Sequence, residues 1–280
     1  MFKKIFSIVG VMGLICFSFY YTHLATVVVK NNDPIMKKII NVSKTYTQKP
    51  VNATFSNNSI IPGVSGLEVD LDKSYESMKK YGAFNEDLVV LKSVTPLVSV
   101  SNIYDKYITR GNDRNNNIAL IIIIDDYSYV ENIVQVLDSK QIKATFFIDK
   151  DIVLDSPDLV KLINSSSHEI ELKSSDYNID GIRKASRELS NITNKDMKFC
   201  YSEKENLTIL TNCSSRKLYT IVPNIPTSNF PYNDVKTKLE NGSIITLKNN
   251  THTLRELKYI INYINQKGYK IVTLEKLIKE

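Results

Sequence analysis

The sequence is poor in the features that mark several broad classes of protein. It has no zinc-finger or RNP pattern, and its 36 Lys and Arg residues are scattered among 30 Asp and Glu residues instead of forming a basic stripe. The net charge of +6 is therefore modest, and the sequence does not favour nucleic-acid binding. Hydrophobic residues make up 42% and charged residues 24%, which argues against both disorder and a polytopic membrane protein. A mildly basic face would still suit an anionic polymer or a membrane surface.

One long stretch without charge stands near the N-terminus. Lys3 and Lys4 precede it and Lys30 ends it, so its length matches what a helix needs to cross a bilayer. A cleaved signal peptide is the alternative, but its apolar core is usually shorter and is followed by a small-x-small cleavage site. We therefore predict an uncleaved single-pass anchor. The positive residues predict that the chain after Lys30 lies outside the cytoplasm, in the cell envelope.

Cysteine is scarce, with three residues in the chain. Cys16 does not fit a lipidation site because Ile15 occupies the place where a small residue is expected. Cys200 and Cys213 would lie in a space that permits oxidation, so they form either a disulfide or two buried free thiols.

Changes in composition predict four regions. Residues 1–30 form the cytoplasmic tip and transmembrane anchor, and residues 31–58, rich in Asn, Lys, Thr and Ser, are expected to be a stalk or linker. Residues 59–116 form a small accessory region, and residues 117–280 form the main domain.

The main domain alternates regular strand and helix patterns. Seven apolar runs are separated by segments with helical spacing, which predicts an α/β fold with a parallel sheet that is open or closed into a distorted (β/α) barrel. The runs read IALIIII, KATFFI, HEIEL, MKFCY, LYTIV, SIITL and YKIV. In a barrel of this kind, catalytic groups gather at the carboxyl ends of the strands.

Asp125 and Asp126 follow the first of these runs directly, in the segment NIALIIIIDDYS. Two adjacent carboxylates repel each other and resist desolvation, so they either have a chemical role or are neutralised by a neighbour. A simpler interpretation is that Asp126 or Ser128 caps the following helix.

The order of segments resembles that of the polysaccharide deacetylases with NodB homology, carbohydrate esterase family 4. IALIIIIDDYS, KATFFID, SHEIELKSSDY and the final GSIITLKNNTHTLRELKYIINYINQKGYKIVTLEKLI carry the resemblance, which covers residues 117–280. The resemblance implies a distorted (β/α) barrel that removes acetyl groups from glycans by hydrolysis. In N-acetylated glycans the bond broken is a carbon–nitrogen bond other than a peptide bond. In the family a divalent metal, usually zinc, assists that hydrolysis.

Carried over by position, the resemblance makes Asp125 the catalytic base and Asp126 a metal ligand. The expected pair of metal-binding histidines falls on Lys173 and Tyr177, which are poor zinc ligands near neutral pH. The remaining degenerate positions are Cys200 and Tyr201, where an arginine is expected, and Lys248, where the acid histidine is expected.

The two lysines suggest how the carboxylates are neutralised. Two ammonium groups carry the same charge as one divalent cation, so Lys173 and Lys248 are predicted to form ion pairs with Asp125 and Asp126 within about 4 Å. No cofactor is expected, and zinc would bind only if the degenerate site still functions.

The other histidines of the chain are not expected to replace the missing metal-binding and acid histidines. His168 and His252 are predicted to be packed or surface side chains, and His23 falls in the anchor. A metal site built from Asp126, Asp176 and His252 is a speculative alternative.

Three functions remain open at this stage. The protein is an active extracytoplasmic deacetylase, a deacetylase-like pseudoenzyme that has lost hydrolysis and binds cell-envelope glycan such as peptidoglycan, or a non-catalytic scaffold that binds an envelope protein. Exposed aromatic side chains at strand ends would favour glycan binding. The candidates are Tyr127, Tyr129, Tyr177, Tyr201 and Tyr219.

Overall fold

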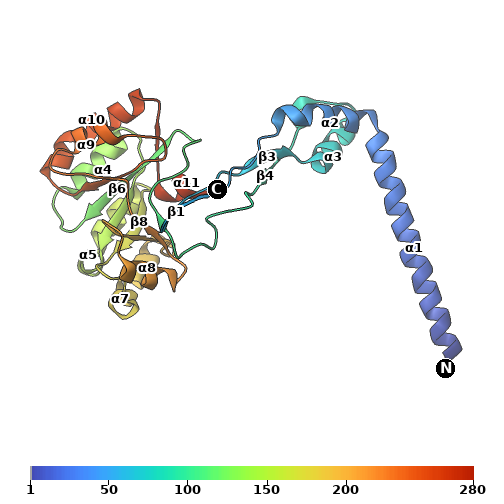
Figure 1. The fold of residues 1–280 in the computed structure, drawn as a ribbon, viewed down its shortest axis with the longest axis horizontal. Coiled ribbons are helices and arrows are strands. Elements are labelled where there is room, and N and C mark those ends of the chain that lie inside the picture. Colours follow the sequence, from blue (N-terminus) through green and yellow to red (C-terminus); the bar gives the residue numbers. More distant parts are fainter. Residues whose placement is uncertain (1) are drawn as a thin grey trace. The chain divides into compact units, whose positions relative to one another are not determined.

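A computed structural model describes residues 2–280, with side chains described for residues 11–22 and 24–280. The chain divides into two compact units. One contains the chain up to Pro50 together with Ser65–Val94, and the other contains Val51–Val64 with Thr95–Glu280 (Figure 1). None of the three predicted boundaries, after residues 30, 58 and 116, coincides with a boundary of the compact units.

The first unit begins with helix α1 (Phe2–Asn32), of which Val11–Asn32 is long and apolar enough to span a membrane or to act as a signal sequence. The rest of this unit consists of α2 (Pro34–Tyr46), β3 (Gly66–Val69), α3 (Leu71–Tyr81), the 3-10 helix η1 (Glu86–Leu88) and β4 (Leu91–Val94). Strands β3 and β4 pair in antiparallel orientation.

The prediction of a stalk over residues 31–58 is wrong for helix α2. The Asp33 side chain accepts a hydrogen bond from the N–H of Ile35 at 2.8 Å and so caps the helix, and Pro34 follows at its first position. Ile39 is fully buried and packs in one cluster with Val69 and Met78. The polar composition concealed a short amphipathic helix because only one of its faces is apolar.

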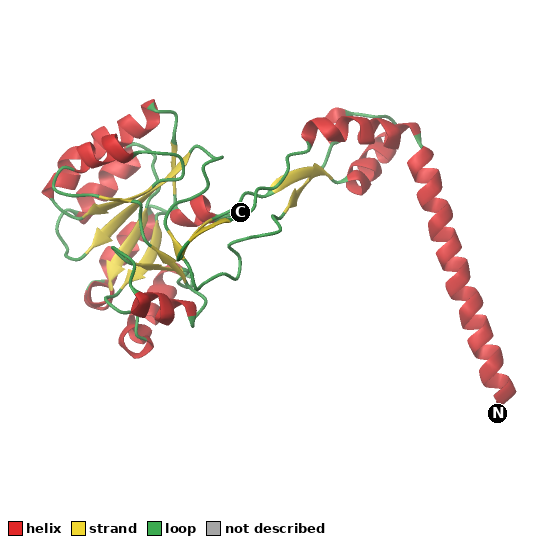
Figure 2. Ribbon diagram, in the orientation of Figure 1, coloured by secondary structure: helices red, strands yellow, loops and turns green. Residues whose placement is uncertain are grey.

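The second unit contains the alternating strands and helices that the sequence predicted (Figure 2). In chain order its elements are β1 (Thr54–Ser56), β2 (Ser59–Ile61), β5 (Tyr107–Ile108), β6 (Asn117–Ile124), α4 (Val130–Ser139), β7 (Thr145–Asp149), α5 (Lys150–Asp155), α6 (Pro157–Ser165), β8 (Glu169–Lys173), α7 (Ile179–Thr193), β9 (Phe199–Tyr201), α8 (Leu207–Ser214), β10 (Tyr219–Ile221), β11 (Ile225–Pro226), α9 (Pro231–Lys238), β12 (Ile244–Lys248), α10 (Thr251–Gln266), β13 (Lys270–Val272) and α11 (Leu274–Ile278).

These strands form two sheets. One has the order β11-β12-β6-β7-β8, with β13 pairing alongside the start of β6, and the other has the order β1-β2-β5-β10-β9. The main strands are parallel, as the alternation with helices predicted. Strand β11 was not predicted, since its two paired residues are too few to give a periodic signal.

The sequence of strand β6 is apolar throughout because the strand is buried on both faces. Its even-numbered residues, including Ile122 and Ile124, pack in a cluster with helices such as α4 and α10, whereas Ile121 and Ile123 pack with Phe147 and Phe199 on the other face. A strand buried on both sides requires a continuous apolar run instead of an alternating one. The run ends at Ile124, so the polar residues that follow emerge at the carboxyl end of the strand.

Cys200 of β9 and Cys213 of α8 form a disulfide. Both cysteines are fully buried. Of the two alternatives left open by the sequence, the structure contains the disulfide, and closing this short loop contributes about 3 kcal/mol in the chain-entropy view.

Candidate functional site

The carboxyl ends of β6, β7 and β8 bring three charged side chains together. The Nζ atom of Lys173 donates a hydrogen bond to Oδ1 of Asp125 at 2.6 Å and lies 4.0 Å from Oδ2 of Asp149. The register pairs Asp149 directly with Lys173, and Asp125 directly follows β6, the next strand in the sheet. Asp125 is 56% exposed and Lys173 is 25% exposed, so this ion pair faces solvent at the mouth of the strands.

The lysine hypothesis is correct for Lys173 and wrong for Lys248. Lys248 is exposed at the end of β12 and takes part in none of the ion pairs formed by residues 24–280. Asp126 instead has polar neighbours: its Oδ1 accepts the N–H of Ser128 at 2.7 Å, and the Asn249 amide donates to its carbonyl oxygen at 3.0 Å. Of these two adjacent carboxylates, the Lys173 ammonium group therefore pairs with Asp125 alone, and a hydrogen bond from the Ser128 N–H satisfies the Asp126 carboxylate.

The proposal that Asp126 or Ser128 caps the following helix is also wrong. Helix α4 starts at Val130, and its N-cap residue is Tyr129, which adopts a left-handed backbone with φ of 59° and makes no side-chain cap. The bond from Asp126 to Ser128 closes a local turn before the helix.

Tyr177 has a structural role at a position where the resemblance expects a metal-binding histidine. Its side chain is fully buried, its OH donates to the carbonyl of Leu172 at 3.1 Å, and the same oxygen accepts the N–H of Tyr201 at 2.8 Å. Burial raises the pKa of the Tyr177 phenol well above its usual value. This side chain is therefore a neutral hydrogen-bonding group that links β8 to β9.

Glu171, at the middle of β8, also links β8 to β9. It is 3% exposed, and its carboxylate accepts the N–H groups of Lys198 at 3.1 Å and Phe199 at 3.3 Å. Strands β8 and β9 belong to different sheets, so no backbone ladder joins them. Oxygen atoms of Glu171 and Tyr177 take over the acceptor role that strand carbonyls would otherwise have.

Several tyrosines proposed for glycan contact are not available. Tyr177 and Tyr201 are buried, and burial raises the pKa of Tyr201 to about 12. Tyr219 is partly buried and packs against Tyr104 with ring centroids 4.7 Å apart. Tyr127 and Tyr129 are exposed by 52% and 39%, so these two remain as surface aromatics beside the aspartates.

The structure does not bring the speculative trio of Asp126, Asp176 and His252 together. Among residues 11–22 and 24–280, whose side chains the structure describes, no group of three or more His, Cys, Asp or Glu side chains is arranged to hold a metal ion. The Asp176 carboxylate accepts the N–H of Asn178 at 3.0 Å, and His252 lies 3.5 Å from the Arg255 guanidinium. That alternative is therefore wrong.

His168 is a packed imidazole, as predicted. It is 4% exposed, its Nδ1 accepts the N–H of Ala144 at 3.3 Å, and its ring packs against Phe146. Burial lowers its pKa to about 4, so it is neutral at physiological pH.

The residues at this site do not fit the divalent metal that the resemblance implies. The Lys173 ammonium has no lone pair to give, and it already donates to Asp125. The Tyr177 oxygen is buried between two backbone partners and holds its proton. What the site offers chemically is an exposed carboxylate held by an ammonium group, with amide and carboxylate oxygens beside it.

Two residues of this site were not identified from the sequence. Asp149 directly follows strand β7 in FFID, the same placement that drew attention to Asp125. Asn249 follows β12, is 7% exposed, and keeps its Oδ1 without a hydrogen-bond partner among the described residues. A search for every polar residue immediately after a predicted strand would have found both.

Comparison with known proteins shows which sequences and folds this chain resembles. Residues 112–210 match the family described as polysaccharide deacetylase. The chain is 26% identical over 276 residues to the uncharacterized protein YlxY of Bacillus subtilis, covering 90% of this chain and 86% of that protein.

Solved structures share the fold. BA3943 of Bacillus anthracis, described as a family 4 carbohydrate esterase pseudoenzyme, matches with a TM-score of 0.69 and 23% identity over 89% of this chain and 96% of its own. PdaA of Bacillus subtilis, a family 4 carbohydrate esterase, matches with a TM-score of 0.55 and 17% identity over 82% of this chain and 97% of its own. A further match, at a TM-score of 0.57 and 20% identity over 62% of this chain and 92% of its own, is the Bc1960 peptidoglycan N-acetylglucosamine deacetylase.

Proposed function

We propose that this chain is a divergent member of the polysaccharide deacetylase family, whose model its residues 112–210 match. In this proposal it is an extracytoplasmic deacetylase-like protein that binds cell-envelope glycan and has lost metal-dependent hydrolysis. Helix α1 anchors it in the membrane in this proposal. Support for the anchor comes from the length and apolar composition of Val11–Asn32. The envelope location follows from the two lysines that precede the apolar run.

The observation that carries the loss of hydrolysis is the contact between Lys173 and Asp125 at 2.6 Å. A cation belonging to the chain stands where the family places a ligand of its metal, and it engages the carboxylate at the base position. Tyr177, the second replaced ligand, stabilises the junction of β8 and β9. Neither side chain can polarise an acetyl carbonyl as a Lewis acid would.

Glycan binding is supported by what remains at the mouth of the strands. Asp125 and Asp149 offer carboxylate oxygens, and Tyr127 offers an exposed ring. Sugar hydroxyl groups are bound by such oxygens, and the apolar faces of sugar rings pack on aromatic rings. The Bc1960 structure is of a peptidoglycan N-acetylglucosamine deacetylase, which makes peptidoglycan the first glycan to test.

The experiment uses the full chain in detergent with one equivalent of zinc. We expect no acetate release from N-acetylated chito-oligosaccharides or from peptidoglycan, together with measurable binding of both glycans that Asp125→Ala or Tyr127→Ala weakens. Stoichiometric zinc binding with turnover abolished by Asp125→Asn would overturn the loss of hydrolysis. Absence of glycan binding would overturn the glycan-binding role.

A restoration experiment tests the assignment of the degenerate positions. One solved relative is a BA3943 mutant described as a pseudoenzyme with restored enzymatic activity. The double variant Lys173→His and Tyr177→His, which restores a histidine at both expected ligand positions, is expected to gain zinc affinity over the natural chain. If zinc binding does not change while the variant remains folded, these are not the positions of the lost ligands.

A further inference from the structure

A groove lined by three arginines lies away from the strand-end site. Helix α7 (Figure 1) supplies most of its length, and Arg216, just beyond α8, also lines it. The groove has a volume of about 400 Å³. Its lining residues from α7 are Ile179, Ile182, Arg183, Ser186, Arg187, Ser190 and Asn191, and Asp196 adds one carboxylate.

Arg216 is held in place by carbonyl groups, without a compensating carboxylate. Its Nε donates to the carbonyl of Asn212 at 3.2 Å, and its Nη2 donates to the carbonyl of Tyr177 at 2.9 Å. Partial burial lowers the pKa of Arg216 from its usual value. The two carbonyls fix the orientation of the guanidinium, which lines the groove and has no carboxylate partner among the residues whose side chains are described.

The two arginines of α7 extend the positive charge along the helix. Arg183 and Arg187 are separated by one turn, which places their side chains about 5 to 6 Å apart on the same face. Arg183 pairs with Asp180 at 3.0 Å, where both side chains are mostly exposed and such a pair is weak. Among residues 24–280, Arg187 forms no ion pair. Three guanidinium groups against the carboxylate of Asp196 leave the lining with a net positive charge.

The dimensions of the groove favour a chain over a single ion. The lining runs from Ile179 to Asn191, a rise of about 18 Å along the helix. Guanidinium groups match phosphate oxygens in geometry and bind them through two parallel hydrogen bonds. Ser186, Ser190 and Asn191 place further hydrogen-bonding groups on the same face.

We propose that this arginine groove binds a phosphodiester-linked polymer, such as a chain of polyol phosphates, independently of the glycan site at the strand ends. Successive phosphates contact Arg183 and Arg187, and Arg216 closes the opposite side. The protein would then carry two binding surfaces of different chemistry, one for neutral sugar and one for polyanion.

Charge-reversal variants of the full chain in detergent test this proposal. Fluorescence anisotropy measures binding of labelled poly(glycerol phosphate), with Arg187→Glu as the test variant. Lys184→Glu is the matched control, because it makes the same charge change on the same helix, at an exposed residue outside the groove lining. We expect Arg187→Glu to weaken binding by about tenfold or more and the control by less than about twofold, since a charge-assisted hydrogen bond contributes more than a distant charge.

Arg187→Lys separates charge from geometry. It keeps the charge but loses the planar guanidinium fork. We therefore expect its affinity for the polymer to lie between the affinities of the natural chain and of Arg187→Glu. Thermal melting confirms that each variant folds. If Arg187→Glu unfolds, Arg183→Gln takes its place, with the same expected direction.

Two further probes identify the source of the phosphate. Inorganic phosphate at millimolar concentration should compete only weakly, and vesicles of phosphatidylglycerol should show no loss of binding with Arg187→Glu. Equal weakening by Arg187→Glu and Lys184→Glu overturns the proposal, because only general charge would then act. It is also overturned if inorganic phosphate binds as tightly as the polymer, or if the vesicles alone respond to Arg187→Glu. Chito-oligosaccharide binding should not change in Arg187→Glu, which keeps this outcome separate from the glycan-binding proposal.

Discussion

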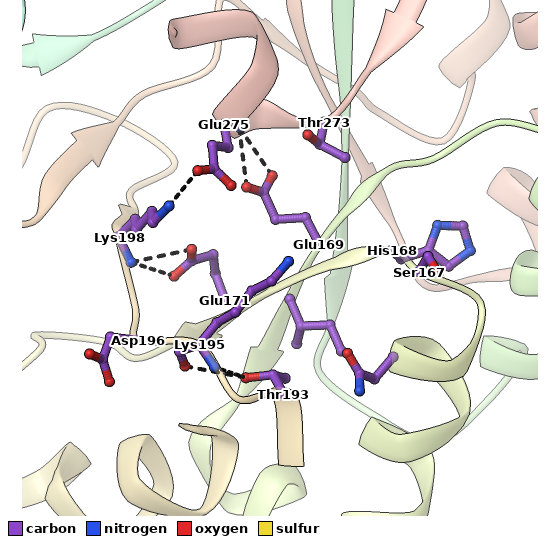
Figure 3. Close-up of a pocket in the computed structure, with 12 residues that line it drawn as sticks. Ser167, His168, Glu169, Glu171, Thr193, Lys195, Asp196, Lys198, Thr273 and Glu275 are labelled. Carbon is purple, nitrogen blue, oxygen red and sulfur yellow. Dashed lines mark hydrogen bonds and ion pairs between the residues drawn. The ribbon is translucent and has the colours of Figure 1, made fainter. Parts of the chain in front are cut away.

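The two ends of strand β8 carry charged side chains that the fold uses differently. Lys173 and its partner Asp125 lie at the carboxyl end of the strands and are open to solvent. Glu169 and Glu171 lie near the other end, where Glu171 is almost fully buried (Figure 3). The exposed ion pair between Lys173 and Asp125 contributes little to the free energy of unfolding. The buried Glu171 carboxylate, in contrast, helps to join the two sheets.

The buried end forms a connected network. Lys198 bonds to Glu275 through its Nζ and to Glu171 through its N–H, and the N–H of Glu275 donates to the Glu169 carboxylate at 3.2 Å (Figure 3). Burial and the neighbouring Glu169 raise the pKa of Glu171 well above its usual value. This network therefore joins the two sheets independently of the ion pair between Lys173 and Asp125.

The largest effect is expected for Glu171→Ala. Removing the carboxylate leaves the N–H groups of Lys198 and Phe199 buried without acceptors, and we expect a loss of about 3 to 5 kcal/mol in the free energy of unfolding. Urea denaturation at neutral pH measures it. Glu171→Gln, which keeps one acceptor oxygen, should lose clearly less. A loss below about 1 kcal/mol for Glu171→Ala would mean that this carboxylate does not hold the sheets together.

His168 should make stability depend on pH. Its folded pKa of about 4 lies below the unfolded value of 6.5, so the unfolded chain binds more protons between these values. Its contribution is complete above pH 6.5 and is lost as the pH falls from about 6.5 to about 4. The slope of stability against pH in this window should flatten in His168→Asn, which keeps an acceptor for the Ala144 N–H. His252→Asn is the control. An unchanged slope in His168→Asn would show that His168 is not buried in its neutral form.

Tyr177→Phe should have an intermediate effect. The substitution keeps the ring but removes the oxygen that accepts the Tyr201 N–H and donates to the Leu172 carbonyl, so we expect a loss of about 1 to 3 kcal/mol. Denaturation of Tyr127→Phe, at an exposed tyrosine, gives the comparison and should show almost no change. Equal losses in the two variants would remove the structural role assigned to the Tyr177 hydroxyl.

The smallest effect is expected for Lys173→Met. Ion pairs that face solvent contribute about 0 to 1 kcal/mol, so stability should fall within that range. Lys248→Met, which breaks no ion pair, should leave stability unchanged. A loss above about 2 kcal/mol for Lys173→Met would remove the contrast between the two ends of β8.

Much of the fold could be predicted from local patterns. The apolar runs of β6 and β7, the helical spacing of α10 and the position of Asp125 directly after β6 all depend on neighbours in sequence. The pairing of Lys173 with Asp125 was predicted through the resemblance, whereas Lys248 was assigned the same role and does not have it.

The sequence by itself determined the alternation of strand and helix and the carboxylates at a strand end, because hydrophobic periodicity reports which faces are buried. Only the tertiary structure decided that Tyr177 and Glu171 bond across β8 and β9, that Arg216 faces α7, and that α2 packs as a helix. These contacts join residues up to several tens of positions apart, and a side chain's partners depend on where the chain returns in space, which no local pattern encodes.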